Sequence, residues 1–67
     1  PYTTLFRSYD MEGIEKIPEM IMNNPTLKPG AMLIMEHSAK TRFTDLVHIF
    51  DQRHYGKVNF SFYRREE

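Results

Sequence analysis

The sequence contains no cysteine, no long apolar run and no surplus of charge of either sign. Without cysteine, neither a disulfide nor a thiolate zinc site can support the fold. The absence also fits a reducing compartment, and we expect a cytoplasmic protein. No apolar run approaches the roughly 20 residues that a membrane-spanning helix needs, so no membrane partner is expected.

Nine basic and nine acidic side chains cancel across the 67 residues. A free-standing nucleic-acid-binding protein normally carries a basic surplus, so the balance argues against that class. The length allows at most one small domain. A chain of this size buries only about 60% of the surface that its unfolded form exposes, and we therefore expect a marginal core.

A helix is predicted over Met11–Asn23. Isoleucines recur at spacings of three and four residues within Ile14–Ile21, which marks one apolar helix face. Asp10 is placed to act as the N-cap. Pro18 removes a backbone donor inside this segment, so a kink or a restart is expected near Ile17. The helix should end at the following Asn-Asn-Pro sequence, because the residue before a proline is driven out of the α region.

Three strands are predicted after the helix. Met32–Glu36 follows a Leu-Lys-Pro-Gly turn and is apolar on both faces, which is typical of a strand covered on both sides. Residues 39–45 show no period and are predicted to form a loop. His48–Tyr55 and Val58–Arg64 flank the two-residue turn Gly56-Lys57, and the second of them alternates apolar with polar residues. The order helix, strand, loop and hairpin predicts an α/β fold.

A family resemblance rests on two sequences in this order. Ile34-Met35-Glu36-His37-Ser38 closes the apolar strand, and Tyr55-Gly56 precedes Val58-Asn59-Phe60-Ser61-Phe62-Tyr63. Together they resemble the RsmD-type family of small-subunit rRNA guanine-N2 methyltransferases. The resemblance implies the C-terminal part of a Rossmann-like, SAM-dependent methyltransferase, with the last strand lying between the other two and antiparallel to both. It implies S-adenosylmethionine (SAM) as cofactor and small-subunit rRNA as partner of the parent enzyme. The cofactor-binding residues would lie upstream, so the fragment itself is expected to bind no cofactor.

The first eight residues, Pro1–Ser8, resemble the translation of a common sequencing-adapter oligonucleotide, which gives the same residues in order. We therefore expect a non-native segment that packs poorly and makes few backbone pairings. The alternative is a genuine Thr-rich strand, because Tyr, Thr and Phe favour β structure. The methyltransferase portion would then comprise residues 9–67.

Two residues are candidates for the site of the parent enzyme. The family carries an Asp/Asn-Pro-Pro-Tyr motif, and Tyr9 stands where its tyrosine would stand, with Phe6-Arg7-Ser8 in place of Asp-Pro-Pro. The resemblance implies that Tyr9 stacks on the substrate base; the alternative is a turn tyrosine that packs on the helix. Glu36 ends the apolar strand at the edge where ligands bind in open α/β sheets. It is a candidate substrate-binding residue, and the alternative is a solvated strand end. Without Asp-Pro-Pro, the fragment is predicted to be inactive.

The remaining polar residues give weaker signals. The three histidines, His37, His48 and His54, lack the spacing of metal ligands, and no metal is predicted. Four arginines could contact RNA phosphates, but acidic neighbours favour a solvated face; the arginines are Arg42, Arg53, Arg64 and Arg65, and the acidic residues are Asp45, Asp51, Glu66 and Glu67. Two other functions stay open. One is a different amino-methyltransferase that acts on DNA or protein, and the other is a non-enzymatic α/β module that adds a strand to a partner.

Overall fold

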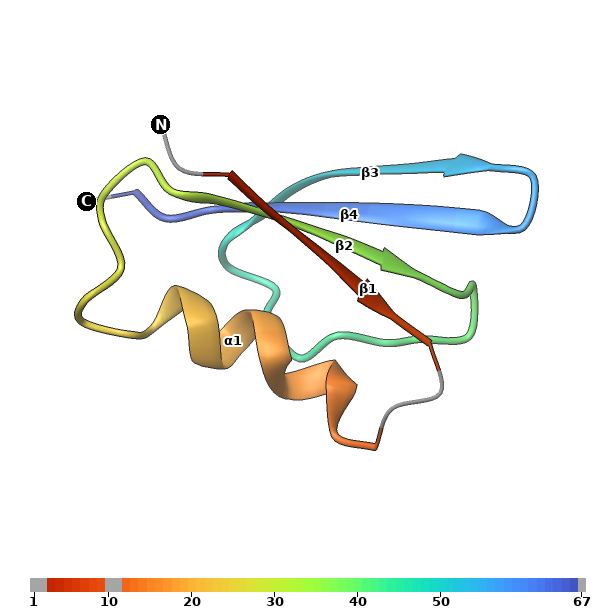
Figure 1. Cartoon of the computed structure of the whole chain (residues 1–67), viewed down its shortest axis with the longest axis horizontal. Helices are drawn as coiled ribbons and strands as arrows, with labels where there is room; N and C mark the ends of the chain where they lie inside the picture. The colour runs from red at the N-terminus through yellow and green to blue at the C-terminus, as the bar shows by residue number, and fades with distance from the viewer. Residues whose placement is uncertain (1–2, 10–11, 67) are drawn as a thin grey trace.

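A computed structural model describes residues 3–9 and 12–66 and shows a small α/β fold. One short helix accompanies a four-stranded mixed sheet with the order β1-β2-β4-β3 (Figure 1). In chain order the elements are β1 (Thr3–Ser8), the 3-10 helix η1 (Ile14–Lys16), α1 (Ile17–Met22), β2 (Met32–His37), β3 (Ile49–Tyr55) and β4 (Val58–Arg64). The predicted α/β class is confirmed at this level.

The C-terminal hairpin forms as predicted. β3 and β4 are antiparallel, and β4 also pairs antiparallel with β2, so the last strand lies between the other two. The turn between the strands contains Gly56 at a φ of 61°. This left-handed conformation favours glycine, because other residues place their Cβ too close to the backbone.

The pairing of β1 corrects one prediction. Thr3–Ser8 was expected to make few backbone pairings, but it runs parallel to β2 through six residue pairs, from Thr3 with Met32 to Ser8 with His37. The expectation is wrong for a physical reason. Without β1, β2 would present an unpaired row of backbone donors and acceptors, and the β-prone threonines, leucine and phenylalanine of this segment can fill that edge. Pro1 and Tyr2 lie outside the described residues.

The helix is shorter than predicted. α1 begins at Ile17 rather than near Met11, which confirms the expected restart, and it ends at Met22. Gly13, at a φ of 81°, interrupts the chain before η1, and Pro18 stands in the first turn of α1, where its missing N–H is not needed. The predicted cap Asp10 lies outside the described residues, as does Met11. Within residues 3–9 and 12–66, no helix has the length and apolar character required to cross a bilayer.

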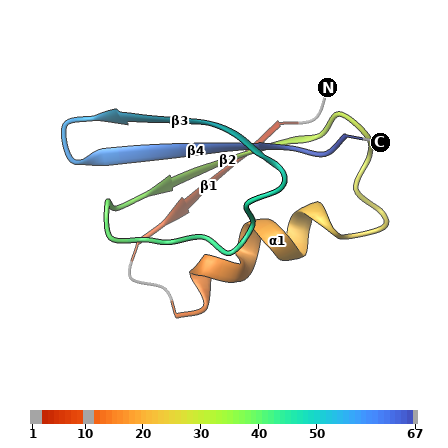
Figure 2. The same cartoon turned by 180° about the vertical axis from the view of Figure 1, so that it is seen from behind.

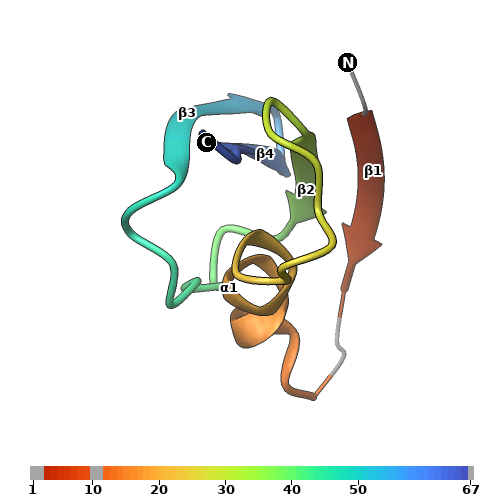
Figure 3. The same ribbon diagram turned by 90° about the vertical axis from the view of Figure 1, so that its left-hand side faces the viewer.

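The core lies between one face of the sheet and α1. Figures 2 and 3 show α1 and the segment between β2 and β3 on the same side of the sheet. The buried apolar cluster comprises Ile14, Met22, Leu33, Met35 and Tyr63.

The opposite sheet face corrects a second prediction. Residues alternate along β2 between half-buried and buried, so Met32–Glu36 is not covered on both sides. In the described part of the chain α1 is the only α-helix, and it covers one face. We call the side bearing α1 the covered face and the other side the open face. Exposed aromatic residues such as Phe50 and Tyr55 lie on the hairpin strand β3.

Candidate functional site

The two residues predicted for the site contact each other. β1 and β2 run parallel, so their carboxyl ends lie at the same edge of the sheet, with Tyr9 just beyond β1 and Glu36 near the end of β2. The Tyr9 hydroxyl donates a hydrogen bond to Glu36 Oε2 at 2.8 Å, and Arg7 Nε donates to Glu36 Oε1 at 3.0 Å. This edge is where ligands bind in open α/β sheets. The geometry therefore joins two candidates that the sequence suggested independently.

The two side chains differ in exposure. Tyr9 is 41% exposed. The Glu36 side chain is 18% exposed, and its two oxygens accept hydrogen bonds from Arg7 and Tyr9.

The electrostatics of this contact fix the protonation of both groups. The hydrogen bond from Tyr9 lowers the pKa of Glu36; its partial desolvation acts in the opposite direction, and Arg7 adds to the lowering. The same hydrogen bond raises the pKa of the Tyr9 hydroxyl. At neutral pH Glu36 is therefore ionised and Tyr9 protonated. The pair offers an aromatic ring and a carboxylate acceptor, two groups that can position a base.

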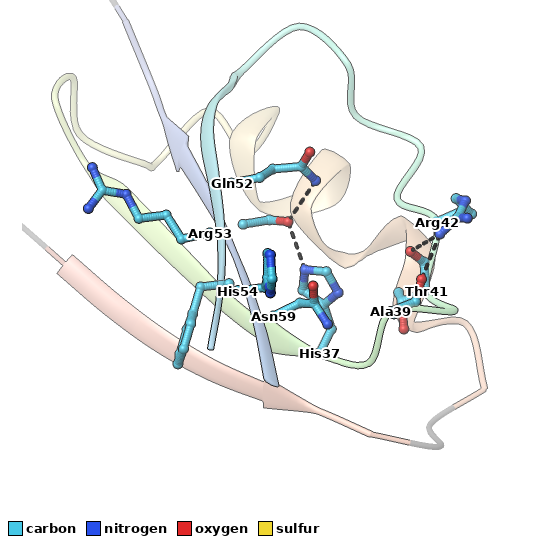
Figure 4. Close-up of a pocket in the computed structure, with 10 residues that line it drawn as sticks. His37, Ala39, Thr41, Arg42, Gln52, Arg53, His54 and Asn59 are labelled. Carbon is cyan, nitrogen blue, oxygen red and sulfur yellow. Dashed lines mark hydrogen bonds between the residues drawn. The ribbon is translucent and has the colours of Figure 1, made fainter. Parts of the chain in front are cut away.

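A cavity of about 290 Å³ lies at the same end of β2, against the loop that follows it (Figure 4). Ten residues line it: His37, Ala39, Thr41, Arg42, Gln52, Arg53, His54, Asn59, Phe60 and Ser61. At its centre, His37 Nε2 lies 2.7 Å from Ser61 Oγ, and Gln52 Nε2 donates to the same Oγ at 3.1 Å. Figure 4 draws both contacts as dashed lines. We call this three-residue chain the His37–Ser61–Gln52 network.

The partner of His37 Nδ1 determines which groups of the network donate hydrogen bonds and which accept them. His37 Nδ1 lies 2.9 Å from the carbonyl oxygen of Ser38, which can only accept, so Nδ1 carries the proton. In the neutral ring Nε2 then accepts from the Ser61 hydroxyl, and Ser61 accepts in turn from Gln52. This tautomer is assigned from the hydrogen bonds. Every polar group of the buried pair is thereby satisfied.

The Ser61–His37 contact has the reach of a nucleophile and its base. However, Ser61 is 0% exposed and His37 5% exposed, so a substrate carbonyl cannot reach the serine oxygen. His37 also packs edge-on against Phe43, with ring centroids 4.7 Å apart. The network therefore forms a hydrogen-bonded floor of the cavity rather than a catalytic pair.

The three histidines do not form one cluster. His48 pairs with Asp45 immediately before β3, whereas His37, which belongs to the network, and His54 line the same cavity. Among the residues that the structure describes, no group of three or more His, Cys, Asp or Glu could hold a metal ion.

The arginines do not form one patch. Arg53 Nε pairs with Asp51 at 3.0 Å, and the Arg64 guanidinium lies 4.5 Å from the centroid of Phe50. Arg65 donates to the backbone carbonyl of Asn24. Arg42 alone among these four lies in the loop after β2, where its Nη1 donates to the carbonyl of Ala39 at 2.8 Å. Arg53, which pairs with Asp51, fits the interpretation of the arginines as part of a solvated face. Arg42 has different surroundings, because it donates to a backbone carbonyl.

The sequence reasoning missed the network, although one signal for it was present. His37 stands two residues after Met35 and four after Leu33, so a strand places all three on one face. A histidine on a buried face needs hydrogen-bond partners. Those partners come from β3 and β4, and they could be named only once the register of the sheet was known.

Comparison of this chain with protein-family models, with curated proteins and with solved structures found no match.

Proposed function

We propose that this chain is the C-terminal part of a Rossmann-like, SAM-dependent methyltransferase that modifies the exocyclic amine of a guanine in small-subunit rRNA. The observation that carries the proposal is the contact of Tyr9 with Glu36 at the carboxyl edge of the parallel strands. The strand order supports it, since β4 lies between β2 and β3 and is antiparallel to both, as the family resemblance implies. β1 then takes the place of the strand that precedes the Asp/Asn-Pro-Pro-Tyr motif.

Tyr9 contributes by positioning the base. The exocyclic amine of guanine is a poor nucleophile because its lone pair is delocalised into the ring, and a fixed orientation can bring that lone pair toward a methyl donor. Stacking of a base on an aromatic ring contributes about 1–3 kcal/mol. The hydrogen bond to Glu36 holds the Tyr9 ring in one direction, so less freedom is lost when a base stacks on it.

The residues of this chain do not fit SAM. Its glycines, Gly13, Gly30 and Gly56, stand in three separate turns, each at a positive φ, rather than in one glycine-rich loop after a strand. The binding of SAM, which supplies the methyl group, is therefore assigned to upstream parts of the parent enzyme. Phe6-Arg7-Ser8 also lacks the carboxylate or amide oxygen that Asp/Asn-Pro-Pro would offer to the guanine amine.

A chimera tests the proposal. In the chimera, residues 9–67 of this chain follow the N-terminal part of an RsmD-type methyltransferase, which ends at its Asp/Asn-Pro-Pro. Transfer of a tritiated methyl group from SAM to undermethylated small-subunit RNA is then measured. We expect transfer by the chimera and a loss of about 5- to 150-fold in Tyr9→Ala, the range that corresponds to the stacking energy.

Tyr55→Ala is the matched control, because Tyr55 is 64% exposed and lies on the hairpin. Its transfer rate should stay within about twofold of the chimera. A folded chimera without activity, or one whose activity survives Tyr9→Ala, rejects the proposal. Transfer to single-stranded DNA or to protein in place of RNA would favour the alternative amino-methyltransferase.

A further inference from the structure

We propose that the cavity at the end of β2 binds a phosphate group, as a free nucleotide or within a nucleic-acid backbone. The site is separate from Tyr9. Glu36 and His37 are neighbours in β2, and successive side chains of a strand point to opposite faces. The inference concerns the binding of an anion and does not rest on methyl transfer.

The charge of the residues that line the cavity is the first observation in favour of an anion. The ten lining residues include two arginines and two histidines but no aspartate or glutamate. The whole chain has nine basic and nine acidic residues, so the cavity departs from the neutral average. Glu36, the nearest acidic residue along β2, contacts Tyr9 and Arg7 on the other side. Arg53 pairs with Asp51 and His37 is engaged in the network, so Arg42 is the guanidinium of this wall that can attract an anion.

The arrangement of hydrogen-bond donors in the cavity is the second observation in favour of an anion. His37, Asn59 and His54 are cross-strand partners on β2, β4 and β3, which places the three side chains next to one another on the covered face. Figure 4 shows His54 and Asn59 beside His37. His37 is engaged in the network, and one Asn59 amide hydrogen is donated to the carbonyl oxygen of Lys57 at 3.4 Å. The His54 ring N–H and the second Asn59 amide hydrogen are the donors that this row offers to a ligand.

Arg42 supplies a charged donor from the loop. Its Nη1 donates to the carbonyl oxygens of Ala39 and Thr41 at 2.8 and 3.3 Å, which fixes the guanidinium at the wall of the cavity. A guanidinium has five N–H donors in a planar fork that matches the oxygens of phosphate, so these two contacts leave others for a ligand.

The chemistry favours phosphate over other ligands. The polar part of the lining offers a guanidinium, an imidazole and an amide but no carboxylate, which suits an oxyanion better than a metal ion. Arginine is the preferred partner where planar, bidentate recognition of phosphate is needed. The cavity of about 290 Å³ exceeds the volume of one phosphate, so an attached sugar can be accommodated. The His37–Ser61–Gln52 network forms a preorganised floor, so little ordering is required on binding.

The test is a titration of the ¹⁵N-labelled 67-residue chain with inorganic phosphate, followed by NMR at constant pH and ionic strength. We expect saturable shifts concentrated in residues 38–42, 52–54 and 59–61. Arg42→Gln and His54→Ala should each weaken phosphate binding by at least about fivefold, because each removes a donor. Both side chains are on exposed residues, so the core is retained in either variant.

Arg53→Gln is the matched control. It removes the same charge from an exposed arginine, but the Arg53 guanidinium pairs with the carboxylate of Asp51, whereas Arg42 donates to backbone carbonyls (Figure 4). Phosphate affinity should change by less than about twofold. Equal weakening in Arg53→Gln, shifts scattered over the chain, or no saturation overturns the proposal.

Three further titrations distinguish a free nucleotide from a nucleic-acid backbone as the source of the phosphate. Guanosine 5′-monophosphate should bind at least as tightly as phosphate, and guanosine without phosphate should leave these signals unchanged. A short single-stranded RNA that binds more tightly than the mononucleotide identifies a nucleic-acid backbone, and equal affinity identifies a mononucleotide. Guanosine shifts that match those of the monophosphate contradict a phosphate site. These outcomes are independent of the chimera, which reports methyl transfer only.

Discussion

Asp45 contacts both the side chain and the backbone of His48. Its Oδ2 lies 2.7 Å from His48 Nδ1, and its Oδ1 accepts the amide hydrogens of His48 and Val47 at 2.7 and 2.9 Å. Burial of this carboxyl group raises its pKa, but the hydrogen bonds from His48 and Val47 together outweigh burial, and the pKa is lowered overall. The side chain of Asp45 is 2% exposed and fixes the chain immediately before β3.

Asp45 should therefore stabilise the fold in a pH-dependent way. Its folded pKa lies below the unfolded value of about 3.9. The contribution is fully present above that value and is lost as pH falls through the folded pKa. Asp45→Asn should lower the free energy of unfolding by about 1–3 kcal/mol at pH 7. Urea denaturation between pH 7 and pH 3 should show this difference shrinking only at the acid end.

Asp51→Asn is the control for this prediction. Asp51 accepts from Arg53 at the surface, with side chains 38% and 61% exposed, so its loss should cost less than about 0.5 kcal/mol. A difference between Asp45→Asn and the native chain that stays constant across the pH range would contradict the role of the carboxylate.

Tyr63→Phe should stabilise the protein. Tyr63 is 0% exposed, and among the described residues its hydroxyl has no hydrogen-bond partner. Burial raises the pKa of this hydroxyl, and the charge of Asp45 raises it further. Removal of an unsatisfied buried hydroxyl should raise the free energy of unfolding by about 1 kcal/mol. In thermal denaturation, Tyr55→Phe at an exposed position should stay within about 0.5 kcal/mol of the native chain. A loss of stability in Tyr63→Phe would show that the hydroxyl is hydrogen-bonded.

Local signals made the hairpin predictable. Gly56-Lys57 and the alternation from Val58 onward specify a turn and a strand within a few residues, and the observed bounds of β4 are the predicted ones. The start of the helix was harder, because Gly13 and Pro18 compete with the isoleucine period. The α-helix begins only at Ile17, because the positive φ at Gly13 and the proline in the first turn together favour a new start there.

The non-local contacts were not predictable. β1 pairs with a strand whose first residue lies 29 positions away, and no local pattern encodes that partner. Tyr9 and Glu36 could each be selected from the sequence, but their contact depends on this pairing. The same holds for His37 and Ser61, which are 24 residues apart and meet only because β2 and β4 share a register.

The isolated 67-residue chain should neither bind SAM nor methylate RNA. Tyr9 and Glu36 offer a ring and one carboxylate, and no glycine-rich loop stands beside them. Calorimetric titration with SAM should give no heat of binding, and tritium transfer to undermethylated small-subunit RNA should match a protein-free blank. Binding at micromolar SAM would mean that the chain itself carries a cofactor site.

Two neighbouring residues of β1 test whether this strand belongs to the fold. Phe6 packs against the core cluster, whereas Leu5 is 49% exposed. If β1 is part of the cooperative structure, Phe6→Ala should lower the free energy of unfolding by about 2 kcal/mol, below the value for a fully buried phenylalanine because Phe6 is only partly covered. Leu5→Ala should change it by less than about 0.5 kcal/mol. Urea denaturation followed by circular dichroism measures both. Equal and negligible effects would mean that Thr3–Ser8 adds no stability, as expected of a segment foreign to the protein. A large effect confined to Phe6 would mean that the segment completes the sheet, since β2 then depends on it to cover an otherwise unpaired edge.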